Sequence, residues 1–153
     1  MSALLTELQT DPMALGYAPL KTARNDAGLF ALMNDKTKFT LLGWISEAAF
    51  NTWCSSHNAE YVNIETLAAN NTSPYYASAK SLLRCLSGAI TQGSINLADA
   101  NVMALLNAWP FVDTTGASKA ALIALGTFPA SRADVLGISA SVSDISNALN
   151  GGV

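Results

Sequence analysis

The sequence predicts an all-α protein, a single helical domain over residues 1–153 that forms an irregular orthogonal bundle of about eight short helices. Ala and Leu, which are strong helix formers, dominate the chain. Apolar residues recur three and four positions apart, behind capping residues and ahead of single glycines. Period-two alternation of β-branched residues, typical of strands, is absent. Helices of roughly 8 to 15 residues are too short for a long parallel bundle.

Three helices are expected in the first 34 residues. Ser2 caps the first. The pair Asp11-Pro12 predicts a second start, because Asp caps a helix and Pro suits its first position, and Gly16 ends that turn. Asn25, or the residue after it, opens the third. Residues 35–42 fit either an extended segment or a loop.

The middle of the chain predicts three more helices. Ser46 caps a helix whose apolar positions follow the helical rule. Asn63 begins a short helix. The pair Ser73-Pro74 opens a helix with a wide apolar stripe, and Gly88 lies where a left-handed C-terminal residue is favoured.

The C-terminal third carries clear start and stop signals. Asn96 is expected to cap a helix that Pro110 ends. A second helix opens near Gly116 and stops at Gly126, and a short one runs from Pro129 to Gly137. The last helix begins with the capping box Ser141-x-x-Asp144.

Charge is scarce in this chain. Only 12% of residues are charged, against roughly 25% in an average soluble domain, and the mean hydropathy is +0.28. Two interpretations remain open. Either the surface is rich in small residues, or other subunits cover part of it, because interface cores are depleted in charge.

The charge pattern excludes nucleic-acid binding as the main function. The net charge is −3, and the eight basic residues form no stripe that could neutralise phosphates. No run approaches the roughly 20 apolar residues of a membrane span. The N-terminus has no basic segment and reaches Glu7 too early for a signal peptide, which predicts synthesis in a cytoplasm.

No catalytic, cofactor-binding or metal-binding motif is recognisable. There is no Walker loop, no dinucleotide fingerprint, no nucleophile elbow and no zincin motif. Cys54 and His57 lie three residues apart and form half a zinc site at best, because Cys85 is the only other thiol. We interpret Cys54 as a buried core residue and His57 as part of a polar helix end. A Cys–His nucleophile pair is the alternative.

Two segments resemble small proteins encoded in the structural modules of tailed bacteriophages. The first, Leu4–Tyr17, reads LLTELQTDPMALGY: a short amphipathic helix, Asp-Pro, and then Gly-Tyr. The second combines SRADVLG at Ser131–Gly137 with VSDISNAL at Val142–Leu149. The resemblance covers about a quarter of the chain, and its motifs are structural, so no functional residue carries over from it.

The resemblance implies a virion component in the head–tail or tail region, without enzyme activity or cofactor. It would act through contacts with copies of itself and with other virion proteins. The alternatives are a capsid decoration protein and a small intracellular helical adaptor or inhibitor. If the chain assembles in this way, aromatic residues are expected to anchor the interfaces, with five candidates: Tyr17, Trp44, Tyr75, Trp109 and Phe111.

Overall fold

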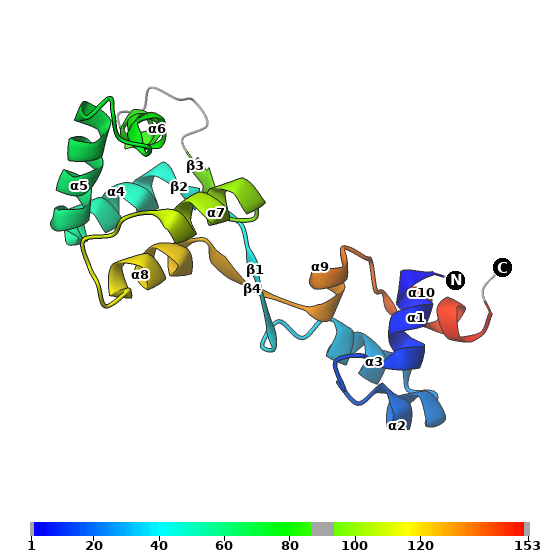
Figure 1. Cartoon of the computed structure of the whole chain (residues 1–153). Coiled ribbons are helices and arrows are strands. Elements are labelled where there is room, and N and C mark those ends of the chain that lie inside the picture. Colours follow the sequence, from blue (N-terminus) through cyan, green and yellow to red (C-terminus); the bar gives the residue numbers. More distant parts are fainter. Residues whose placement is uncertain (1, 87–93, 152–153) are drawn as a thin grey trace. The chain divides into compact units, whose positions relative to one another are not determined.

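The computed structural model describes residues 2–86 and 94–151 and is mostly helical (Figure 1). Helix makes up 60% of the structure, with ten helices in the described part of the chain. The mainly helical prediction is therefore confirmed. The same residues also contain four short strands in two small sheets, so the purely α class is not confirmed. The orthogonal bundle stays a prediction.

The single domain over residues 1–153 stays a prediction, but the buried residues form two separate clusters and not one core. The chain divides into two compact units. Unit 1 combines both ends, Met1–Leu41 and Pro129–Val153, and unit 2 is the continuous stretch Leu42–Phe128. The boundary falls within β1 (Phe39–Leu42) and β4 (Thr127–Ala130), which pair in a two-stranded sheet. A discontinuous unit leaves no local signal, because sequence patterns report on neighbours along the chain.

Unit 1 is built around α3, which lies against α2, α9 and α10, while α1 packs on α10. Its buried core includes Leu8, Leu29, Met33 and Ile145, all with exposed fractions of 0%. The helices of this unit are α1 (Ala3–Thr10), α2 (Tyr17–Thr22), α3 (Asp26–Met33), α9 (Arg132–Leu136) and α10 (Val142–Leu149).

Unit 2 is built around α4, which contacts α5, α6, α8 and β2 (Figure 1). Its core includes Ile45, Phe50, Trp53 and Leu97. The sheet of β2 and β3 is antiparallel. The elements are β2 (Trp44–Ser46), α4 (Glu47–Ser56), α5 (Asn58–Ala69), α6 (Tyr76–Leu86), β3 (Ser94–Asn96), α7 (Ala100–Ala108) and α8 (Ala117–Leu125).

Side-chain caps define most helix starts, as the sequence predicts. Ser2, Asn25 and Ser46 each accept a backbone N–H from the first turn. Ser141 and Asp144 form the predicted reciprocal capping box at the start of α10.

Two predicted helix starts in the first half of the chain are wrong. Asp11 is the C-cap of α1 in the left-handed region (φ 41°), and α2 begins only at Tyr17. Helix α5 begins at Asn58, so Asn63 lies within it, because α4 and α5 meet at His57 with no intervening loop.

The remaining differences lie near the strands. Asn96 belongs to β3, and Asp99 caps α7. Pro129 lies in β4, and Ser131 opens α9 with a second capping box. The ambiguous residues 35–42 contain β1. The expected helix end at Gly88 lies outside the described residues.

Candidate functional site

Two of the five aromatic interface candidates are core residues. Tyr17 is fully buried in unit 1, and Trp109 is 9% exposed in unit 2. In this conformation packing in the core accounts for both rings, and their role as interface anchors stays a prediction. Tyr17 follows Gly16, whose left-handed backbone (φ 94°) turns the chain into α2 and the ring toward the core.

Tyr75 and Phe111 are half-buried and pack on the unit 2 core. The Tyr75 hydroxyl donates to the carbonyl of Ala108 at 2.6 Å, and its ring meets Trp109 edge-on with centroids 5.5 Å apart. Phe111 lines an apolar cavity of about 50 Å³ together with Trp53 and Trp109. These contacts explain both residues by packing alone.

Trp44 is the exception among the five, because 56% of it is exposed. It lies in β2 opposite Asn96, and its neighbour Ile45 is fully buried. Successive side chains of a strand point to opposite faces, so a buried Ile45 directs Trp44 outward. Phe128 (48%) and Val112 (53%) are further large apolar residues exposed on unit 2.

The backbone beneath Trp44 is held on both sides. Gly43 donates its N–H to the carbonyl of Gly126 at 2.8 Å and accepts the N–H of Leu97 at 2.9 Å. The Phe128 ring lies over Gly43, where an added Cβ would approach a ring carbon to 3.0 Å. Trp44 is therefore presented from a fixed strand, which lowers the entropy cost of using it in a contact.

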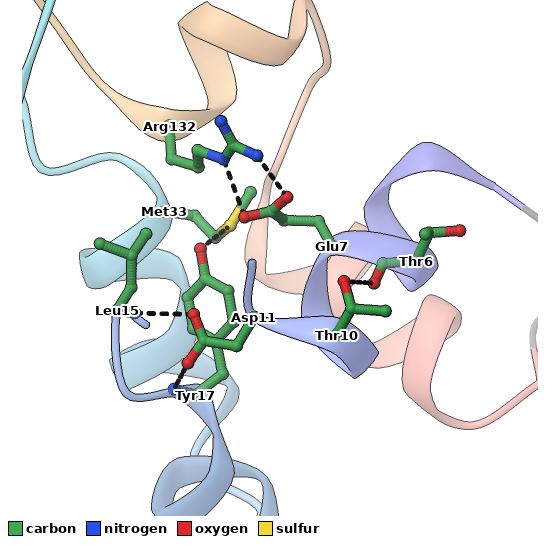
Figure 2. Close-up of polar contacts among 8 residues, drawn as sticks. All are labelled: Thr6, Glu7, Thr10, Asp11, Leu15, Tyr17, Met33 and Arg132. Atoms are coloured by element: carbon green, nitrogen blue, oxygen red, sulfur yellow. Dashed lines mark hydrogen bonds and ion pairs between the residues drawn. The ribbon is translucent and has the colours of Figure 1, made fainter. Parts of the chain in front are cut away.

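A cluster of buried polar side chains lies in unit 1 (Figure 2). Arg132 donates from Nε to Glu7 Oε1 at 2.8 Å and from Nη2 to Oε2 at 2.7 Å, a bidentate ion pair. The Glu7 and Arg132 side chains are only 4% and 12% exposed. The hydrogen bonds to Glu7 raise the pKa of Arg132, which keeps the guanidinium charged.

Tyr17 completes this cluster. Its hydroxyl donates to the sulfur of Met33 at 2.8 Å (Figure 2). Burial raises the pKa of the Tyr17 hydroxyl, and the charge of Glu7 raises it further. A phenol held neutral beside a paired carboxylate offers no base or nucleophile. The arrangement stabilises the unit and gives no indication of acid–base chemistry.

Asp11 explains the Asp-Pro…Gly-Tyr motif by geometry. Its carboxylate accepts the backbone N–H groups of Leu15 at 2.7 Å and Tyr17 at 3.1 Å (Figure 2), and that of Gly16 at 2.8 Å. Desolvation alone would raise the pKa of Asp11, but these bonds lower it overall. The carboxylate thus satisfies the start of α2 from the end of α1, and the motif is structural.

Cys54 and His57 are held by different environments. Burial raises the pKa of the Cys54 thiol to about 11, which disfavours the thiolate that a nucleophile needs. The His57 ring stacks on Trp53 with centroids 5.0 Å apart. Its Nδ1 lies 3.0 Å from both the Trp53 carbonyl and Ser56 Oγ. The structure therefore gives each residue a packing role.

The sequence does not single out Glu7, Arg132 or Phe128 as notable positions. The first two look like ordinary charges on helix surfaces, and only their meeting across 125 residues of chain makes them a buried pair. An apolar position between two helical segments gave no sign that Phe128 is exposed on a strand.

Residues 2–86 and 94–151 contain no group of three or more His, Cys, Asp or Glu side chains that could hold a metal ion. No helix in this part of the chain combines the length and apolar character needed to cross a bilayer. Every buried side-chain nitrogen or oxygen there has a hydrogen-bond partner. No family model, curated protein or solved structure matches the chain.

Proposed function

We propose that this protein is a structural component of a tailed-phage virion, in the head–tail or tail region. It acts there through contacts with copies of itself and with other virion proteins. The single observation that carries the proposal is Trp44, a large aromatic side chain 56% exposed on a strand whose backbone is fixed. The resemblance of both chain ends to phage structural-module proteins supplies the setting.

An exposed tryptophan is well suited to anchor a protein–protein contact. Trp buries 150–250 Å² when covered and is enriched among the residues that carry most of an interface's binding energy. The low charge of the chain agrees with a surface that is partly covered in use. A stable contact centred on Trp44 is expected to bury upwards of about 1,000 Å² in total.

Incorporation into particles tests the proposal. Wild-type protein is expected to co-purify with particles at a fixed stoichiometry. Trp44→Ala is expected to lower its occupancy by about 30-fold, the equivalent of a 2 kcal/mol hot spot. Quantitative mass spectrometry of purified particles measures this. Val62→Ala is the matched control, because Val62 is 49% exposed on α5 and loses apolar surface elsewhere in unit 2.

The outcomes separate the alternatives. Trp44→Ala at wild-type occupancy contradicts the role of Trp44, and wild-type protein absent from particles contradicts the virion role. Occupancy that matches the number of capsid subunits points to decoration of the capsid. A monomer that is absent from particles and captures one cellular protein points to an adaptor. Circular dichroism of each variant shows whether the fold is kept.

A further inference from the structure

The chain path divides this protein unequally. Unit 2 is one continuous stretch, Leu42–Phe128, whereas unit 1 joins Met1–Leu41 to Pro129–Val153. Unit 2 can therefore complete its contacts from local chain. Unit 1 can form only when two segments from opposite ends of the sequence meet, which costs loop-closure entropy unless unit 2 is already folded between them.

The two hydrophobic cores share no residue. All members of the first core lie in unit 2, around Ile45, Trp53 and Leu122. All members of the second core lie in unit 1, around Leu8, Leu29 and Ile145. Separate cores of this kind are the usual basis of separate cooperative units.

A buried ion pair joins the two segments of unit 1, and its loss is expected to destabilise that unit. Glu7 lies on α1, and Arg132 is the first residue of α9. Both side chains are almost fully buried. Removing one partner of a buried ion pair leaves an uncompensated charge, which is far more damaging than the loss of an exposed pair. The Arg132 guanidinium also lies 6.0 Å from the ring centroid of Phe39, which lies on β1 in the first of the two segments.

We infer that unit 1 unfolds as a separate cooperative unit closed by the Glu7–Arg132 ion pair, while unit 2 stays folded. The continuous unit 2 carries Trp44, and the discontinuous unit 1 has a lower free energy of unfolding than unit 2. The inference rests on the chain path, the disjoint cores and the buried pair, and does not depend on the proposed function.

The distribution of tryptophan provides a direct readout. Trp44, Trp53 and Trp109 are the only tryptophans in the chain, and all lie in unit 2. Tryptophan fluorescence therefore reports the unfolding of unit 2 alone. Hydrogen exchange resolved by peptide follows α1, α3 and α10 of unit 1 separately.

The test uses the full-length chain and Arg132→Met. Exchange in α1, α3 and α10 is expected to accelerate about 100- to 1,000-fold, because Glu7 is left buried and unpaired. The urea midpoint of tryptophan fluorescence is expected to stay at its wild-type value. Glu7→Leu combined with Arg132→Met is expected to restore most of the protection, because an apolar pair can replace a buried ion pair.

The matched control is Lys36→Met. Lys36 pairs with Asp134 in the same unit at 3.5 Å, but the two side chains are 63% and 40% exposed. Its loss is expected to change exchange by less than about fivefold. In Arg132→Met, the urea midpoint of tryptophan fluorescence and the hydrogen-exchange protection of unit 1 could fall together. That result overturns the inference, because the chain is then one cooperative unit. Unchanged hydrogen exchange in Arg132→Met overturns the inference as well, because the ion pair then does not stabilise unit 1.

Discussion

Glu60 provides the sharpest test of how unit 2 is stabilised. Its carboxylate is 2% exposed, and it accepts the N–H of Asp113 at 2.8 Å and the N–H of Val112 at 3.1 Å. Glu60→Gln keeps the shape but turns one oxygen into an NH2 group, which then faces a backbone donor. A buried N–H left without an acceptor costs about 1–3 kcal/mol. The remaining bond loses its charge assistance, about 1 kcal/mol more.

Unit 2 is therefore expected to lose about 2–4 kcal/mol in Glu60→Gln. With a urea m value of about 1 kcal/mol/M for a unit of this size, the tryptophan fluorescence midpoint falls by roughly 2 M or more. Glu65→Gln is the control, because Glu65 is exposed on the same helix and Gln can still accept a hydrogen bond. Its effect is expected to stay within about 0.5 kcal/mol. Equal midpoints for the two variants would refute the reasoning.

Three further predictions follow from single positions. Gly126→Ala places a Cβ 2.7 Å from Leu97 Cδ1 in the core, so overpacking is expected to lower the free energy of unfolding in urea by about 1–3 kcal/mol. An unchanged free energy of unfolding would mean that the core side chains rearrange to accept the methyl group. Burial raises the pKa of the Cys54 thiol to about 11, so roughly a thousandth of it is thiolate at pH 8. Brief iodoacetamide treatment followed by peptide mapping is therefore expected to find Cys54 labelled only in denaturant. Hydrogen bonds, first from the Thr115 hydroxyl, hold the pKa of Asp113 well below its unfolded value of about 3.9. Because the folded pKa is the lower one, this stabilisation is complete above about pH 5 and declines as the pH falls further. Asp113→Asn is expected to flatten that part of a profile of urea midpoint against pH, and a profile parallel to that of the wild type would contradict the prediction.

Local chemistry in the sequence determined much of the secondary structure. Ser2, Asn25, Ser46 and the Ser141–Asp144 box predicted helix starts that the structure has. These signals work because a capping side chain satisfies backbone groups within its own first turn.

The wrong helix starts arise because a residue of capping type does not always cap the helix that follows it. A capping residue can serve a helix it does not directly precede: Asp11 ends α1, and its carboxylate reaches forward to the N–H groups that begin α2. Asn63 donates to the carbonyl of Pro110 from inside α5, although its residue type favours a cap. The residue type shows that a side chain can form a hydrogen bond with the backbone, but it does not show which backbone group will be the partner.

The candidate site depended on tertiary structure even more. Tyr17, Trp44 and Trp109 are aromatic residues on apolar segments, and nothing in the sequence distinguished the exposed Trp44 from the other two. The difference comes from β2, where a buried Ile45 forces its neighbour outward.

By itself, then, the sequence determined a mainly helical chain with low charge, several helix caps and no recognisable catalytic motif, because these follow from residue chemistry within a few positions. Only the tertiary structure decided that the two ends form one unit, that Glu7 meets Arg132, and that Trp44 faces outward. Contacts between residues more than 100 positions apart depend on how the whole chain closes. A local pattern contains no information about that closure.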